Sequence, residues 1–166
     1  MSLTSENELS EKVRVFLSHN QIRDNASILV GLSGGPDSVC LLSTLCELNT
    51  DKTRRIGCCY VDHGIRGKEE TEADQAFVDS LAKRFSIPVF KKIIEPGFID
   101  RTAVNENRSC EDVARSLRYA LLNETAKEEE FEYIALGHTQ DDNIETIIMR
   151  FFQGSGINGL EGIVSR

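Results

Sequence analysis

The sequence predicts an α/β fold, a doubly wound parallel sheet with helices on both faces. The first observation is alternation, because four short apolar runs rich in branched residues are each followed by a segment of helical spacing. The second is size and composition: the 166 residues are 40% hydrophobic and 28% charged, which suits one globular domain with a substantial core. In such a sheet, ligands gather at the carboxyl ends of the strands.

The expected strands are apolar runs bounded by polar residues, glycine or proline. In chain order they cover residues 28–32, 55–61, 87–94 and 133–136. Pro88 suits the start of the third strand better than its middle, because proline cannot donate a hydrogen bond to a neighbouring strand.

The expected helices share apolar residues at three- and four-residue spacing. They cover residues 5–18, a segment after residue 35 that ends near 48, segments that follow Thr71 and Ser109, and about 141–152. Their candidate core residues are Leu9, Val13, Phe16 and Leu17, then Val39, Leu42 and Leu45, then Ala73, Phe77, Leu81 and Phe85, and finally Val113, Leu117, Ala120 and Leu121.

Capping-box spacing marks two of these helix starts, Thr71 with Asp74 and Ser109 with Asp112. Between residues 95 and 108 no periodicity persists. We therefore expect a polar loop there that could cover a site.

Charge and hydropathy exclude several classes of protein. No apolar run approaches the roughly 18 to 20 residues that span a bilayer, and the polar N-terminus lacks the apolar region of a secretory signal. We therefore expect a cytoplasmic protein with no membrane partner. A formal charge of −8 argues against a broad basic surface for nucleic acid, but it leaves a local basic channel open.

The five cysteines are odd in number and form no C-x-x-C pair. Most lie in apolar segments, which favours buried, reduced thiols over a disulfide framework or a zinc site. Cys110 lies at an expected helix start, which leaves a weak case for catalysis open.

The most explicit chemistry lies between the first strand and the next helix, in the six residues Ser33, Gly34, Gly35, Pro36, Asp37 and Ser38. A helix start has unpaired backbone N–H groups and a partial positive charge, so it can bind phosphate. The glycines let the backbone approach a ligand closely, and the serines can add hydroxyl donors. Beside a polyphosphate, Asp37 would be repelled unless a cation bridges the two, which suggests Mg²⁺.

An ordinary strand-to-helix turn is the alternative for these six residues. They match neither the Walker P-loop nor G-x-G-x-x-G. They resemble the SGGxDS signature of the PP-loop ATP pyrophosphatases. That resemblance implies a fold like that of the adenine nucleotide alpha hydrolases and cleavage of ATP between its α- and β-phosphates.

A second group of polar residues follows the fourth strand. Asp141 and Glu145 are one helical turn apart, where their carboxylates could bind a cationic amine or a metal. Asp142 has capping-box spacing from Thr139, so a structural role is equally open. His138 could act as an acid or base or contact phosphate, the alternative being an ordinary polar loop residue.

A third group lies on the helix after Ser109, where Glu111, Arg115 and Arg118 fall near one face. Arginines directed toward the site could bind phosphate through the planar guanidinium. The alternative is a surface ion pair of Glu111 with Arg115, which contributes only a few tenths of a kcal/mol.

Five motifs in this order resemble the tRNA(Ile)-lysidine synthetase family over about residues 28–163. They are SGGPDS at 33–38, VDHGIR at 61–66, ExxARxxRY at 111–119, LGHTQDDNxE at 136–145 and GSGINGL at 154–160. The resemblance implies an ATP-dependent carbon–nitrogen ligase. In that reaction ATP adenylates the C2 oxygen of the wobble cytidine of tRNA(Ile), and free L-lysine displaces AMP.

The resemblance also implies roles for individual residues. Residues 33–38 would hold ATP, Asp37 would act through Mg²⁺, and Arg115 and His138 would lie near the reacting phosphate or base. Asp141 and Glu145 would position the lysine ammonium, and Arg118 would bind substrate.

It further implies that residues 1–166 are a single PP-loop catalytic domain, a fragment lacking C-terminal tRNA-binding domains. Such a fragment should bind ATP or AMP but modify tRNA poorly. A homodimer is left open. The alternatives are another PP-loop enzyme such as a tRNA thiolase, or a nucleotide-binding module without catalysis. The lack of paired C-x-x-C motifs counts against a thiolase that uses an iron–sulfur cluster.

Overall fold

The computed structural model describes residues 3–33, 35–65, 67–139 and 147–153. The elements are α1 (Leu3–His19), β1 (Ser27–Leu32), α2 (Pro36–Leu48), β2 (Arg55–Asp62), α3 (Lys68–Phe85), β3 (Val89–Ile93), α4 (Phe98–Glu106), α5 (Cys110–Glu128), β4 (Tyr133–Thr139) and β5 (Ile147–Gln153). In these ranges, no helix is long and apolar enough to cross a membrane.

The strands form one sheet in the order β3-β2-β1-β4-β5. The first four are parallel, which confirms the predicted parallel sheet, and β5 is antiparallel to β4. From β1 the chain builds outward through β2 to β3, then returns to add β4 on the other side of β1. The order therefore reverses between β1 and β4, the point where open α/β sheets bind ligands.

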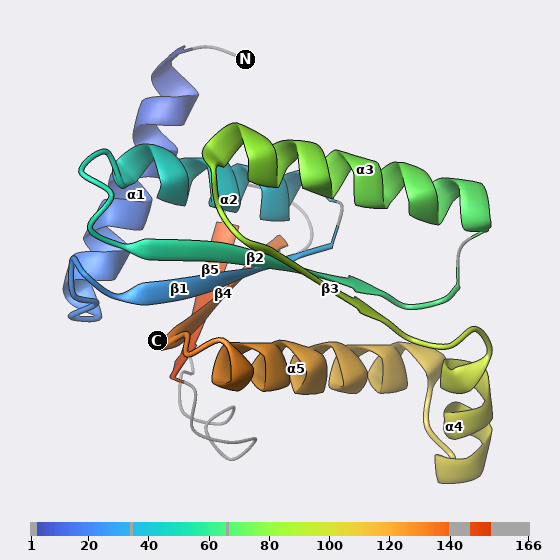
Figure 1. Ribbon diagram of the computed structural model, residues 1–166. Helices are drawn as coiled ribbons and strands as arrows, with labels where there is room; N and C mark the ends of the chain where they lie inside the picture. Colours follow the sequence, from blue (N-terminus) through green and yellow to red (C-terminus); the bar gives the residue numbers. More distant parts are fainter. Residues whose placement is uncertain (1–2, 34, 66, 140–146, 154–166) are drawn as a thin grey trace.

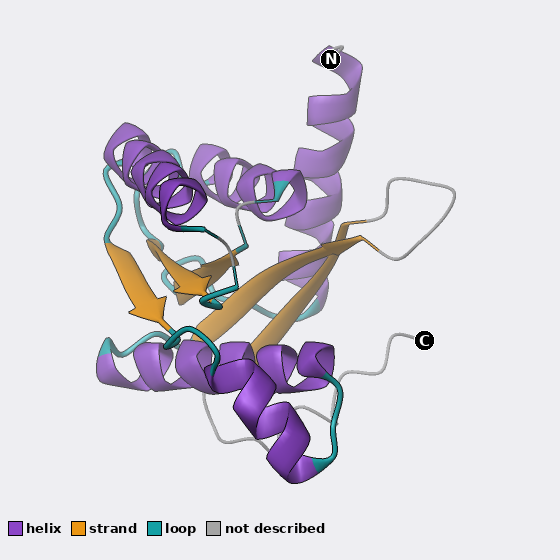
Figure 2. Ribbon diagram, turned by 90° about the vertical axis from the view of Figure 1, so that its right-hand side faces the viewer, coloured by secondary structure: helices purple, strands orange, loops and turns teal. Residues whose placement is uncertain are grey.

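Helices cover both faces of the sheet, as the sequence predicts. In Figures 1 and 2, α1, α2 and α3 lie on one face, and α4 and α5 on the other. Alternating side chains of β1 serve the two layers: Ile28, Val30 and Leu32 pack toward the first, and Leu29 toward the second. Both layers of the core are therefore built from the same strands.

Two expectations about where helices lie are wrong. Residues 95–108 contain α4, whose buried Ile99 and Ala103 are one turn apart, a signal too short to stand out in the sequence. The helix expected over about 141–152 is contradicted at 147–153, which form β5. Branched and aromatic residues suit either element there, and pairing with β4 decides the outcome. Residues 140–146 lie outside the described ranges.

The predicted cap at Thr71 is also wrong. Helix α3 begins at Lys68 after the extended residue Gly67, and Thr71 lies inside the helix. Asp74 accepts a hydrogen bond from the Tyr60 hydroxyl (3.5 Å), so it contacts β2 from inside the helix. Acidic residues in the first turn of α3 complement the helix dipole instead.

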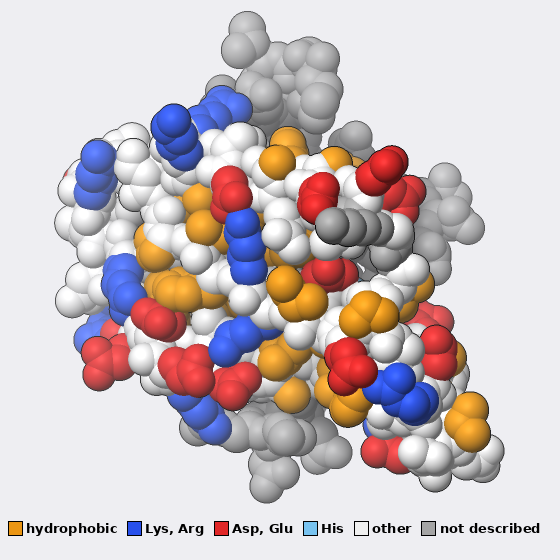
Figure 3. Space-filling view, turned by 45° about the vertical axis from the view of Figure 1, so that its right-hand side comes forward, with side chains coloured by type: hydrophobic (Ala, Val, Ile, Leu, Met, Phe, Trp, Pro, Cys, Tyr) orange, Lys and Arg blue, Asp and Glu red, His pale blue; other side chains and the backbone are white. Residues whose placement is uncertain are grey.

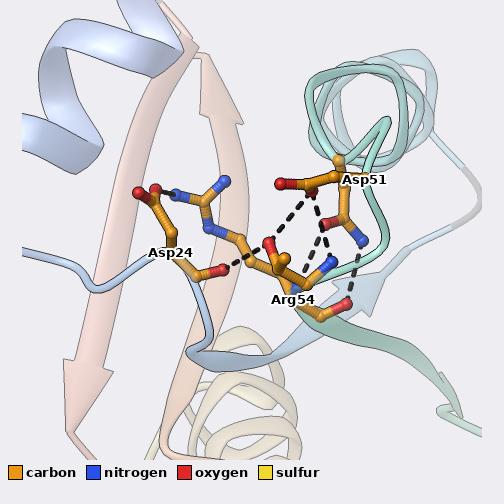
Figure 4. A network of polar contacts seen from close by, with 5 residues as sticks. Asp24, Asp51 and Arg54 are labelled. Carbon is orange, nitrogen blue, oxygen red and sulfur yellow. Dashed lines mark hydrogen bonds and ion pairs between the residues drawn. The ribbon is translucent and has the colours of Figure 1, made fainter.

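At the amino ends of the strands, polar contacts join the loops before β1 and β2 (Figure 4). Arg54 pairs with Asp24 at 2.6 Å, and the Thr53 hydroxyl donates to the Asp24 carbonyl at 3.0 Å. The Arg54 side chain is only 11% exposed. A hollow of about 470 Å³ beside this network is lined by Arg14, Arg23 and Arg54, each paired with a carboxylate.

All five cysteines are free. Cys58 and Cys59 are buried, as expected, whereas Cys40 and Cys46 are only partly buried. Burial raises the pKa of the Cys58 thiol to about 12 and that of Cys46 to about 11. Cys110 is exposed, and its thiol donates to Asp100 at 3.4 Å, which raises its pKa. A protonated thiol is a poor nucleophile, so the structure gives no support to a catalytic Cys110.

Candidate nucleotide-binding site

The phosphate loop, residues 33–38, connects the end of β1 to the start of α2. The N-cap residue Gly35 has an extended backbone and no side-chain cap, and Pro36 occupies the first helical turn. Most helices satisfy their first N–H groups with a capping side chain. A helix that starts without one at the carboxyl end of a buried strand is arranged to receive an anion.

Ser38 shapes this loop from inside. Its side chain is 1% exposed, and its hydroxyl donates to the Gly35 carbonyl at 2.9 Å. The same oxygen accepts the Ser33 backbone N–H at 3.2 Å. Ser38 therefore holds the two ends of the turn together. The Ser33 hydroxyl lies 3.3 Å from that of Ser38 and accepts the Gly35 N–H at 3.4 Å, although Ser33 as a whole is exposed.

Gly137 brings the end of β4 against this loop. A Cβ atom placed on Gly137 would lie 2.9 Å from the backbone carbon and oxygen of Asp37 and 3.0 Å from the Ser38 nitrogen. Only glycine permits so close an approach. The backbone of His138 therefore follows directly beside the first turn of α2. The His138 side chain and the residues Asp141, Asp142 and Glu145 lie outside what the structure describes.

The loop after β2 opens at the same edge. Asp62 is 8% exposed and accepts the Gly64 N–H at 2.9 Å, in a turn where Gly64 has a φ of 65°. His63 is half-buried, and burial lowers its pKa, with a further lowering from Arg118 and a partial offset from Asp62. The VDHGIR motif at residues 61–66 contains His63, but the residue spacing did not indicate that His63 is a candidate site residue.

The arginines of α5 lie close to Tyr119. The guanidinium carbon of Arg115 is 5.3 Å from the Tyr119 ring centroid, and that of Arg118 is 6.0 Å from it. No contact within 4 Å joins Arg115 to Glu111, so the alternative of an ion pair between these two described residues is not supported. Arg118 is half-buried and Arg115 is exposed.

A family model described as a PP-loop domain matches residues 5–166. The chain belongs to the PP-loop family. The matched region includes the SGGxDS signature at residues 33–38, which leads into the start of α2.

Curated relatives of this PP-loop domain are tRNA(Ile)-lysidine synthases. That of Clostridium perfringens is 38% identical over 156 residues, which cover 93% of this chain and 32% of the relative. That of Clostridioides difficile is 39% identical over 145 residues, covering 87% of this chain and 30% of the relative. The PP-loop domain thus spans about a third of the length of these relatives.

Solved structures with the same fold are more distant in sequence. The tRNA thiolase NcsA of Methanococcus maripaludis, solved with a [4Fe-4S] cluster, has a TM-score of 0.65 at 22% identity over 80% of this chain and 45% of that chain. An NMN synthetase from Francisella tularensis has a TM-score of 0.55 at 18% identity, covering 78% and 52%. These similarities support the α/β fold.

One side chain at the phosphate loop, that of Asp37, has the chemistry of a Mg²⁺ ligand. Among the residues that the structure describes, no three His, Cys, Asp or Glu side chains cluster as a metal site. Mg²⁺ is commonly held by one or two carboxylates together with substrate phosphates. Asp37, in the first turn of α2, carries a carboxylate of this kind.

Proposed function

We propose that this PP-loop domain binds ATP in the phosphate loop and uses it to convert the wobble cytidine of tRNA(Ile) to lysidine. The observation that carries the proposal is the uncapped start of α2, packed against Gly137 at the sheet's point of reversal. The curated relatives support the choice of tRNA as substrate.

In the proposed reaction, the C2 oxygen of cytidine attacks the α-phosphorus of ATP, and pyrophosphate leaves. The uncharged amine of free L-lysine then attacks C2, AMP leaves, and the new nitrogen loses a proton. Residues 33–38 hold the nucleotide, and Asp37 would share a Mg²⁺ ion, which neutralises phosphate charge when bound. Arg115 and His138 act near the reacting phosphate or base.

Lysine recognition is assigned to Asp141 and Glu145, whose carboxylates would pair with the ammonium group, and Arg118 is assigned to substrate binding. The assignment of the two acids rests on sequence and on the closeness of the β4 end to the phosphate loop. It extends the proposed ATP site toward the second substrate.

The test is ATP-dependent AMP release with tRNA(Ile), with and without lysine. We expect the 166-residue chain to bind ATP in calorimetry but to form lysidine slowly beside the full-length C. perfringens relative. Product that forms without lysine would contradict the lysidine reaction. Efficient lysidine formation by the chain would contradict the expected need for further domains.

A tRNA thiolase is the second candidate, since the NcsA structure shares the fold. The cysteines argue against the form that uses an iron–sulfur cluster. The sequence has no C-x-x-C pair, and the adjacent Cys58 and Cys59 are buried in opposite layers of the core. Sulfur incorporation into tRNA without lysine would favour this candidate. Nucleotide binding without AMP release by the full-length protein would favour a non-catalytic module.

A further inference from the structure

The hollow at the amino edge of the sheet brings together three arginines from separate segments. Arg14 comes from α1, Arg23 from the loop before β1 and Arg54 from the loop before β2. The volume of about 470 Å³ falls within the roughly 300 to 1,000 Å³ of small-molecule sites. This arginine hollow lies at the opposite edge of the sheet from the phosphate loop, so a ligand there is distinct from the ATP of the proposed function.

The arginine hollow is cationic in an acidic protein. Its lining holds three arginines and one acid, Asp24, which gives a net charge of +2, whereas the whole chain carries −8. From outside the lining, Glu11 pairs with Arg14 at 3.3 Å. Glu132 likewise pairs with Arg23 at 2.8 Å. Both pairs are exposed to solvent, where ion pairs are weak, so the hollow keeps a local excess of positive charge.

The guanidinium of Arg54 has more donor capacity than Asp24 uses. Its Nη2 donates to the Asp24 carboxylate at 2.6 Å, whereas its buried Nε has no partner among the described residues (Figure 4). Buried polar nitrogens are nearly always paired. A guanidinium carries five N–H donors in all, so each of the three arginines can bind a second anion beside its carboxylate.

Capping of a helix end does not account for these arginines. Helix α1 ends beside the hollow, and basic side chains often bind the last carbonyls of a helix. Here the carbonyls of residues 16–18 accept backbone N–H groups of residues 20–22 at 2.9 to 3.0 Å. These carbonyls are therefore satisfied by the loop that follows the helix.

We propose that the arginine hollow binds a phosphomonoester, a phosphate group carried by a small organic molecule. Such a phosphate has a charge of about −1.5 to −2 at pH 7, which matches the lining, and its oxygens can accept from several guanidinium groups at once. The buried Leu17 and Ile22 and the partly buried Leu48 give the lining an apolar part that can contact the organic body.

The test is an NMR titration of the 166-residue chain with phenyl phosphate. Backbone N–H signals report where the probe binds: those of Ile22, Arg23 and Asp24 for the arginine hollow, and those of Gly35 and Ser38 for the phosphate loop. The buried Nε–H of Arg54 is a further reporter. We expect saturable shifts of the signals from the hollow.

Two other probes separate the phosphomonoester from related anions. Benzoate has the same ring but a single charge, and we expect it to bind at least about fivefold more weakly at the signals from the hollow. Hexauridylate without a terminal phosphate presents only the phosphodiesters of RNA. It should bind more weakly than phenyl phosphate there.

Arg14→Met and Arg23→Met should each weaken phenyl phosphate about fivefold or more at the hollow, because each removes charged donors. Arg101→Met is the matched control. Arg101 also forms an exposed pair at 3.3 Å, with Glu95, but lies on α4 on the other face of the sheet (Figure 1). The control should leave the affinity within about twofold. Circular dichroism checks folding, and Arg14→Lys, which keeps the charge, should weaken binding less than Arg14→Met.

Shifts confined to the phosphate loop would overturn the proposed site, as would equal affinity of the wild type and both arginine variants. Benzoate that binds as tightly as phenyl phosphate would contradict recognition of phosphate. Tighter binding of hexauridylate would contradict a small-molecule ligand and assign the hollow to RNA. None of these results bears on ATP binding in the phosphate loop, so a failure of this inference is distinguishable from a failure of the proposed function.

Discussion

At the scale of single residues, Gly137 sets the distance between β4 and the phosphate loop. The nearest atoms to its missing side chain are backbone atoms of Asp37 and Ser38, which cannot rotate away as a flexible side chain could. The phosphate loop therefore fits beside β4 only because Gly137 has a hydrogen atom where every other residue has a Cβ atom.

Gly137→Ala should displace the first turn of α2 and weaken ATP binding about tenfold, measured by calorimetry. Gly67→Ala is the control, since a Cβ there meets nothing within 4 Å. Equal ATP affinity of Gly137→Ala and the wild type would show that the loop tolerates the shift.

His63 gives a pH dependence whose sign follows from its lowered pKa. In the unfolded chain the imidazole has its ordinary pKa of 6.5, so below that pH the unfolded state binds more protons than the folded state. The free energy of unfolding should therefore fall as the pH decreases through about 6.5 toward the lower folded pKa. Urea unfolding at a series of pH values measures this fall, and His63→Asn should reduce it. An unchanged fall in the variant would assign the effect to other groups.

At the scale of elements, α5 begins where its cap predicts. The Ser109 hydroxyl accepts the Asp112 N–H at 3.0 Å and donates to the Asp112 carboxylate at 2.8 Å. This cap was predictable because all of its partners lie within four residues. The helix carries both arginines of the candidate site, so its starting point fixes where they lie.

Ser109→Ala should lower the free energy of unfolding by about 1 kcal/mol, the usual contribution of a serine cap. Urea denaturation measures the loss. Ser80→Ala is the control, since the Ser80 hydroxyl donates to the Phe77 carbonyl within α3 and caps no helix end. A loss no larger than that of the control would mean that Asp112 or water replaces the cap.

Helix faces were harder to predict than helix starts. In α3 the expected core residue Leu81 is buried, but the expected Phe77 is 45% exposed, and Val78 and Ala82, which were not expected, are buried. In α5 the expected Ala120 is exposed, whereas Leu122 is buried. The spacing of apolar residues predicts that a segment is helical. Which side of the helix is buried depends on how the helix packs on the sheet, and a single sequence does not reveal that packing.

At the scale of the whole molecule, the carboxyl ends of the strands border the candidate site, whereas the amino ends carry the polar network around Arg54. The parallel pairing places the carboxyl ends of β1, β2 and β4 at one edge of the sheet, the edge at which the sequence predicted that ligands gather. The influence of Arg118 on the pKa of His63 was not predictable, because it depends on how α5 crosses the sheet. On the face seen in Figure 3, acidic and basic side chains are interspersed.

Substitutions at the amino edge of the sheet should lower the stability of the fold and leave the candidate site unchanged. Arg54→Met removes a nearly buried guanidinium that joins two loops, and we expect a loss of about 1 kcal/mol in urea denaturation. ATP affinity should stay within about twofold. Arg14→Met is the control, because the Arg14 pair with Glu11 is exposed and contributes little. A large loss of ATP affinity in Arg54→Met would show that the two edges are coupled.

The outer position of β3 has a consequence for association between molecules. Within the described chain β3 pairs only with β2, so its other side presents backbone groups that a foreign strand could join. Lys91 and Lys92 lie on this strand and are held by Asp79 and by Glu124 and Glu128. Lysines on an outer strand discourage such joining. Neutralising both lysines, by acetylation for example, should therefore promote association of protein molecules through pairing of their β3 strands.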